Sequence, residues 1–242
     1  MKLIYKNRWS DAEVEAHWDQ VADQYIDANN TIKDAHDQRF EKMISWLNLP
    51  DVGSVLNITS RDCEANDYIN AAAPNLDVTN AEISAELMRV AGARRPYAKQ
   101  VKLDNYSVLP FLDAAFDRIC CLETLEHVSE PVVFLRELNR VCKADGVMVL
   151  SCPPHSCEWS YRLYTLLFGG HGEGPHRFLP SREVKQMLIE SGWILLHHEG
   201  TLLLPAGPKA LQIKAERFIS KYQKIKFVAE MGIRQFYVCK KN

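Results

Sequence analysis

Between residues 54 and 152, short apolar segments alternate with segments whose apolar residues follow helical spacing. The apolar segments have the length and composition of buried strands, and they cover residues 54–58, 76–82, 116–122 and 146–151. Strands that alternate with helices usually pair in parallel, and the helices then cover both faces of the sheet. The pattern therefore predicts an α/β fold built on an open, mostly parallel sheet.

The turn after the first strand is the segment that most affects function. Sheets of this kind usually bind a cofactor there, and glycines let backbone N–H groups approach the ligand. Here the turn reads Thr59-Ser-Arg-Asp-Cys63 and has no glycine. A non-glycine residue at positive φ costs about 1–2 kcal/mol, and the added side chains would crowd a ligand. Two interpretations of Arg61 are open: it pairs with a cofactor carboxylate, or it occupies the pocket with its own charge.

We expect one domain over residues 1–242. An aromatic-rich, helical cap is expected over residues 1–50 and a cofactor-binding core over residues 54–152. Residues 153–180 are rich in glycine and proline, which favours a lid inserted over the edge of the sheet. C-terminal helices and the last strands are expected over residues 181–242.

The net charge of −2 gives no reason to expect a nucleic-acid partner. No apolar run is long enough to span a bilayer, and the N-terminus does not resemble a signal peptide. The seven cysteines lack metal-like spacing. Cys120 and Cys121 are neighbours in a predicted strand and should point to opposite faces. Reduced, buried thiols fit a cytoplasmic protein.

Several motifs in the second half of the core occur in a recognisable order. They include Leu103-Asp-Asn-Tyr-Ser-Val-Leu-Pro-Phe-Leu-Asp-Ala-Ala-Phe-Asp117, Leu125-Glu-His-Val128 and Lys143-Ala-Asp-Gly146. With these motifs the chain resembles the small-molecule branch of the class I S-adenosylmethionine (SAM)-dependent methyltransferases over roughly residues 36–200. The resemblance implies a Rossmann-like, seven-stranded methyltransferase fold with an antiparallel last strand, expected at 233–238. It also implies SAM as the cofactor.

The resemblance implies which positions contact the cofactor. Glu82 aligns with the acid that binds both ribose hydroxyls, and Asp104 aligns with the residue that accepts a hydrogen bond from the adenine amino group. The other expected contacts are Asn57, Thr59, Ile83, Asn105, Leu122 and Glu123. Structural alternatives remain open for both acids: Glu82 as a solvated acid at the end of a strand, and Asp104 as a turn former.

Methyl transfer to an oxygen or carbon atom also needs a base, and histidine suits that role near neutral pH. The catalytic candidates are His127 and His176, and His155 and His171 also lie near the expected site. A structural role is the alternative for each. His171, Glu173 and His176 lack a fourth ligand at a recognisable spacing, so we expect no metal site.

Two functions are consistent with these features. The first is a SAM-dependent methyltransferase that acts on a small-molecule or glycan-type acceptor. The alternative is a non-catalytic binding or scaffold protein with a decayed methyltransferase fold. Glu82 and Asp104 favour the first function, whereas the missing glycines favour the second.

A predicted amphipathic helix over residues 209–226 carries most of the basic charge near the C-terminus. Its expected apolar stripe consists of Leu211, Ala215, Phe218, Tyr222 and Ile225. The basic residues beside that stripe are Lys209, Lys214, Arg217, Lys221 and Lys224. Either the helix packs on the core with a solvated basic face, or the basic face meets an anionic partner.

Overall fold

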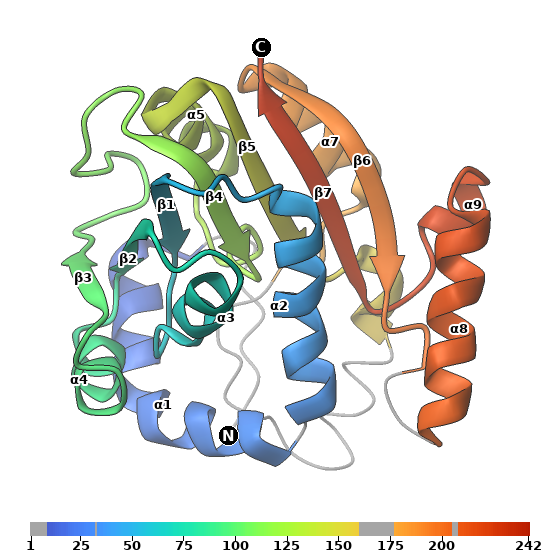
Figure 1. Ribbon diagram of the computed structural model, residues 1–242, viewed down its shortest axis with the longest axis horizontal. Coiled ribbons are helices and arrows are strands. Elements are labelled where there is room, and N and C mark those ends of the chain that lie inside the picture. The colour runs from blue at the N-terminus through green and yellow to red at the C-terminus, as the bar shows by residue number, and fades with distance from the viewer. Residues whose placement is uncertain (1–8, 32, 160–176, 205–207) are drawn as a thin grey trace.

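The computed structural model describes residues 9–31, 33–159, 177–204 and 208–242, and its centre is one seven-stranded sheet (Figure 1). The strand order is β3-β2-β1-β4-β5-β7-β6. The strands are β1 Gly53–Ile58, β2 Leu76–Glu82, β3 Lys99–Lys102, β4 Phe116–Leu122, β5 Cys142–Cys152, β6 Trp193–Thr201 and β7 Arg234–Lys241. Strands β1 to β5 pair in parallel, and β7 is antiparallel to both β5 and β6. The predicted fold class is confirmed, including the antiparallel last strand.

Helices cover both faces of the sheet. They are α1 Asp11–Thr31, α2 Lys33–Leu47, α3 Glu64–Ala72, α4 Ala85–Arg94, α5 Pro131–Val141, α7 Ser181–Glu190, α8 Lys209–Tyr222 and α9 Lys226–Ala229. Buried residues of α1, α4, α5 and α7 form one hydrophobic core with one face of the sheet. Those of α2 and α3 form a second core on the opposite face, which is the nearer one in Figure 1.

Neighbouring residues of the central strands contribute to different cores, as the two-residue period of a strand requires. Leu56 lies in the first core and Val55 in the second. Cys121 and Cys120 divide in the same way, which confirms the expectation that they point to opposite faces. All seven cysteines are free thiols. This double burial explains why the strands read as continuous apolar runs in the sequence.

Side-chain hydrogen bonds start helix α1 and attach it to the segment after β2. Ser10 and Glu13 form a capping box, in which the Glu13 N–H donates to Ser10 Oγ at 3.3 Å and the Ser10 N–H donates to Glu13 Oε2 at 3.0 Å. Ser84 caps α4, and its hydroxyl also donates to Asp19 Oδ1 at 2.6 Å. Because Asp19 belongs to α1, its neighbour Trp18 is held beside the end of β2.

The sequence-based interpretation of the C-terminal helix was wrong in two respects. The helix ends at Tyr222, and α9 follows as a separate turn. Its buried residues are Ala215 and Ile219, whereas most of the expected apolar stripe is exposed. The physical reason is that α8 packs beside the last strand in the sheet order, β6, so only a narrow strip of the helix is covered.

Some predictions fall outside the part of the chain that the structure describes. They are the catalytic candidate His176, the pair His171 and Glu173, and most of the expected lid at 153–180. Within the described ranges, no helix is both long and apolar enough to cross a membrane, and no cluster of metal-ligating side chains occurs.

Candidate functional site

A small pocket lies where β1 and β4 end, at the edge where open α/β sheets bind ligands. We name it the β1–β4 pocket. It is lined by residues 57–62, 64–65 and 122–123, and by Tyr25, Arg39 and Phe40. Its volume is about 20 Å³, which is room for about one water molecule. Four predicted cofactor contacts therefore line one pocket: Asn57, Thr59, Leu122 and Glu123.

The turn without glycine adopts the conformations that glycine would supply. Thr59, Arg61 and Cys63 have φ values of 52°, 54° and 61°. Such a backbone costs about 1–2 kcal/mol for each residue that carries a Cβ. The turn is closed by the Ser60 N–H, which donates to the Ala81 carbonyl at 3.1 Å, and by the Cys63 N–H, which donates to the Ser60 carbonyl at 2.8 Å. The strained backbone therefore depends on surrounding contacts.

One of these contacts comes from Arg95, directly after α4. Its guanidinium donates to the Asp62 carbonyl oxygen at 2.8 Å and to Asp62 Oδ2 at 2.9 Å. It also donates to Asp67 Oδ2, at 2.8 Å, and Asp67 lies in α3. One cation thus joins the turn, the helix after it and the end of α4. A side-chain network replaces glycine flexibility in holding this turn.

Glu82 is fully buried and directed at the same turn. Its Oε2 accepts a hydrogen bond from the Arg61 N–H at 2.8 Å. Its Oε1 accepts from the N–H groups of Ile83 at 2.9 Å and Ser84 at 3.1 Å. Both carboxylate oxygens are therefore bonded to the backbone of this chain. Glu82 is a buried, bonded acid, so the interpretation of a solvated strand-end acid was wrong.

The side chain of Arg61 fills the space beside Glu82. Its guanidinium lies over the ring of Trp18, 3.7 Å from the ring centroid, and 5.8 Å from the ring centroid of Tyr25. Nη1 lies 4.0 Å from Glu82 Oε1 and is buried without a hydrogen-bond partner. In this arrangement the charge of Arg61 fills space beside the pocket, as in the second interpretation, while pairing with a cofactor carboxylate stays a prediction.

An amide network supports the floor of the β1–β4 pocket. Asn57 Nδ2 donates to Asn80 Oδ1, and Asn80 Nδ2 donates to Asn66 Oδ1, both at 2.8 Å. These three buried amides join β1, β2 and α3. Asn57 is therefore committed to a structural hydrogen bond through its Nδ2.

The opposite wall is formed by Glu123, which directly follows β4 and has a φ of 50°. Its Oε1 accepts from the Ser151 hydroxyl at 2.5 Å and from Arg234 Nε at 3.2 Å. Burial lowers the pKa of Arg234, and the Glu123 carboxylate acts in the opposite direction. This ion pair joins the ends of β4 and β5 to the start of β7.

Other predicted site residues lie away from this pocket. Asp104 is exposed, and Asn105 Oδ1 accepts from the N–H groups of Ser107 and Val108 in a local turn. Ile83 is buried in the core and does not line the pocket. The structure therefore does not bring Asp104 and Asn105 to the same pocket as Asn57 and Glu123.

His127, the first catalytic candidate, is buried in the turn that follows β4. Its ring packs edge-on against Trp18 with 5.5 Å between ring centroids, and its Nε2 lies 3.9 Å from Glu126 Oε1. It does not line the β1–β4 pocket. His127 therefore helps to hold the Trp18 ring, over which the Arg61 guanidinium lies.

Trp18 and Tyr25 were not predicted as site residues. They belong to α1, far from the first strand in sequence, and their rings meet edge-to-face at 5.1 Å between centroids. The available signal was the concentration of aromatic residues in the N-terminal segment. That signal does not identify which ring contacts Arg61.

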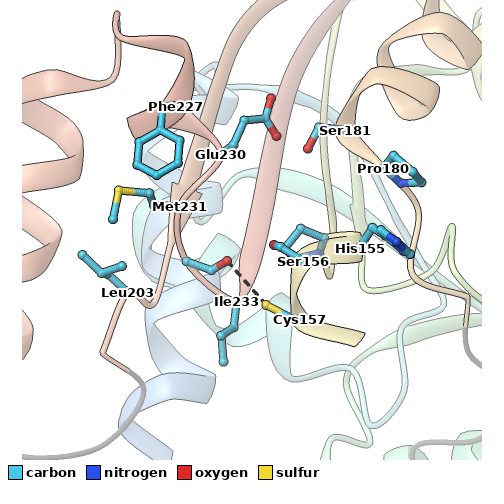
Figure 2. A pocket seen from close by; sticks show the side chains of 12 residues that line it. His155, Ser156, Cys157, Pro180, Ser181, Leu203, Phe227, Glu230, Met231 and Ile233 are labelled. Atoms are coloured by element: carbon cyan, nitrogen blue, oxygen red, sulfur yellow. Dashed lines mark hydrogen bonds between the residues drawn. The ribbon is translucent and has the colours of Figure 1, made fainter. Parts of the chain in front are cut away.

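A larger pocket lies beyond the end of β5 and next to the start of β7 (Figure 2). We name it the β5–β7 pocket. It is lined by residues 154–157, 180–181, 203, 227 and 230–233, and its volume is about 470 Å³. Figure 2 shows Leu203, Phe227 and Met231 on one side, and Ser181, Pro180 and His155 on the other. Most of its side chains are apolar, and the polar groups come from His155, Ser156, Ser181 and Glu230.

Comparison with known proteins finds similarity over the central part of the chain. The methyltransferase domain family matches residues 62–150. A demethylmenaquinone methyltransferase of Thermotoga maritima is 24% identical over 151 residues, which are 61% of this chain. The match spans just under two thirds of that relative, 66% of its length.

Solved structures share the fold over nearly the whole chain. A putative methyltransferase crystallised in complex with the Trm112 methyltransferase activator of Haloferax volcanii has a TM-score of 0.69 at 15% identity, with 94% of this chain and 97% of that one covered. The [4+2]-cyclase SpnF has a TM-score of 0.68 at 14% identity, with 98% and 99% covered. The central segment therefore matches the methyltransferase domain family, and the chain has the fold of the class I SAM-dependent methyltransferases, which its motifs had indicated.

Proposed function

We propose that this protein transfers a methyl group from SAM to an apolar small molecule. The methyltransferase domain match and the relative named demethylmenaquinone methyltransferase support the reaction class. The observation that carries the acceptor class is the β5–β7 pocket. Its volume of about 470 Å³ lies in the usual range of small-molecule sites, about 300–1,000 Å³. Its mainly apolar lining suits such a molecule better than a glycan.

The two pockets are neighbours, which supports a shared reaction. Ile233 lines the β5–β7 pocket, and the next residue, Arg234, pairs with Glu123 of the β1–β4 pocket at 3.2 Å. Both lie at the same edge of the sheet. The Arg234–Glu123 ion pair would therefore lie between a molecule in the β5–β7 pocket and the predicted cofactor site.

Two residues that line the β5–β7 pocket, His155 and Cys157, are candidates for the base that deprotonates the acceptor. Nδ1 of His155 lies 3.1 Å from Glu158 Oε2, an arrangement that orients the ring. Burial raises the pKa of the Cys157 thiol, so this cysteine stays protonated near neutral pH. We propose His155 as the base, while His127 and His176 stay proposals from the sequence.

The predicted roles of the cofactor-contact residues in SAM binding also stay proposals. The β1–β4 pocket, as the side chains are now arranged, is too small for SAM. SAM joins a nucleoside to an amino acid, whereas the β1–β4 pocket has a volume of about 20 Å³. The Arg61 guanidinium occupies the space between Trp18 and Glu82. The residues as arranged do not fit the cofactor, so its binding requires Arg61 to leave.

Titration calorimetry with SAM and S-adenosylhomocysteine tests the reaction class. We expect binding near 100 µM, because a loss of about 3 kcal/mol weakens a micromolar site about a hundredfold. Transfer is then measured as S-adenosylhomocysteine formed in the presence of apolar quinols and phenols, with demethylmenaquinol-type compounds first. No binding at millimolar cofactor together with no product formed would contradict the proposal.

The acceptor pocket has its own test. Met231→Asp places a charge in the β5–β7 pocket and should raise the KM for an apolar acceptor at least tenfold. Leu211→Asp is the matched control, because Leu211 is half exposed on α8 and does not line this pocket. Equal KM values for the two variants would exclude the β5–β7 pocket as the acceptor site.

A second function, binding of an apolar ligand without methyl transfer, is favoured by the position of Arg61. The fold is compatible with other chemistry, since SpnF is named a [4+2]-cyclase. Tight ligand binding in the β5–β7 pocket, with no affinity for SAM or S-adenosylhomocysteine, would favour this second function.

A further inference from the structure

Arg61 has the properties of a side chain that closes a ligand site from within. Its backbone adopts a φ of 54°, which directs the side chain from the turn toward α1. Only 9% of the side chain is exposed, so the cation has left water almost completely. Stacking on Trp18 replaces part of the lost hydration, because the face of an indole ring attracts a cation.

The polar contacts of the guanidinium are incomplete. Glu82 is the acid beside it, but both oxygens of Glu82 already accept backbone N–H groups. The ion pair is correspondingly long, at 4.0 Å, and Nη1 has no hydrogen-bond partner. A buried donor without a partner is costly. The side chain is therefore held mainly by the Trp18 ring, and its departure into water would restore the missing hydrogen bonds.

The rest of the turn does not depend on this side chain. The Arg61 N–H bonds to Glu82, and Arg95 holds Asp62 through two hydrogen bonds. The Arg61 side chain can therefore move while the backbone of the turn keeps its shape.

We propose that Arg61 is a displaceable plug: its side chain closes the β1–β4 pocket by resting on Trp18, and ligand entry requires the guanidinium to leave that ring. This inference rests on the proposed function, because it takes S-adenosylhomocysteine as the ligand that opens the site. The plug makes the affinity of the site depend on one side chain. A desolvated cation–π contact corresponds to about 2 kcal/mol, or about a thirtyfold change in affinity.

Calorimetric titration of S-adenosylhomocysteine into the wild type and Arg61→Gly tests the plug. Glycine keeps the positive φ without strain and removes the side chain, so we expect affinity at least tenfold tighter than in the wild type. Arg61→Ala is the second variant, with the same threshold, in case the glycine variant is unstable. Arg94→Ala is the control, because Arg94 contacts the same turn through Asp62 at 3.5 Å but does not line the pocket.

The outcomes separate the plug from the proposed function. Tighter binding in the Arg61 variants, with Arg94→Ala unchanged, supports the plug, even where the wild type binds too weakly to turn over. Equal binding in the wild type and the Arg61 variants overturns the plug and leaves the methyltransferase proposal standing. Equal tightening in Arg94→Ala also overturns it, because the effect then follows charge near the turn. No binding in any variant overturns both proposals.

Discussion

Glu82 is the side chain on which the turn without glycine most depends, and Glu82→Ala tests this. The substitution leaves the N–H groups of Arg61, Ile83 and Ser84 without their acceptor. Each buried donor left unpaired costs about 1–3 kcal/mol. Water entering the vacated space offsets part of that loss, so we expect the free energy of unfolding to fall by about 3–5 kcal/mol.

Glu82→Gln separates the hydrogen bonds from the volume of the side chain. Its carbonyl oxygen can still accept from Ile83 and Ser84, while its amide group faces the Arg61 N–H. One bond is then lost, and we expect a decrease of about 1–3 kcal/mol. Glu86→Gln is the control, since the Glu86 side chain is about half exposed and pairs with the surface residue Arg89 at 2.7 Å, a contact that solvent screens and that contributes little to stability.

Urea denaturation followed by circular dichroism gives all three values, and equal m-values confirm that the same transition is compared. A Glu82→Ala protein within 0.5 kcal/mol of Glu86→Gln would refute the claim that Glu82 holds the turn. If one carboxylate accepts three backbone hydrogen bonds, Glu82→Ala should lower the free energy of unfolding most, Glu82→Gln less, and Glu86→Gln least.

Two further predictions concern stability elsewhere. Burial raises the pKa of Glu199, but His197, Lys42 and Ser220 together outweigh it and hold this pKa at about 2. Glu199→Gln should therefore lower stability by about 1–3 kcal/mol at pH 7. Because the folded pKa is depressed, this difference should vanish as pH falls from about 4.5 to 2, and a constant difference in thermal melts contradicts it. Ala114 is exposed and has a φ of 51°. Ala114→Gly should therefore raise the free energy of unfolding by about 0.5–1 kcal/mol. A melting temperature below that of the wild type would show that the backbone at Ala114 is not strained.

The sheet was predictable because its strands are buried on both faces and read as apolar runs. The left-handed turn was also predictable in kind, since Thr59, Arg61 and Cys63 stand where the family has glycines. The contact between Arg61 and Trp18 was not, because the two residues lie in separate elements and no local pattern joins them. The β5–β7 pocket could not be predicted from the sequence for the same reason, because several short, separate segments contribute one or a few residues each.

The exposed face of α8 shows the opposite kind of failure. Periodicity there predicts an apolar stripe, yet Phe218 and Tyr222 are 44% and 39% exposed. Helical spacing indicates which residues share a face, but the neighbouring element decides how much of that face is buried. An anionic partner for the basic residues of α8 stays a prediction, tested by co-sedimentation with anionic vesicles at low and high salt.

The displacement of Arg61 can be seen in a crystal structure of the wild type saturated with S-adenosylhomocysteine. We expect the ligand to lie in the β1–β4 pocket, the Arg61 guanidinium to have left the Trp18 ring, and the backbone of residues 59–63 to keep its left-handed conformations. A structure in which the ligand occupies this pocket while Arg61 still rests on Trp18 would contradict it.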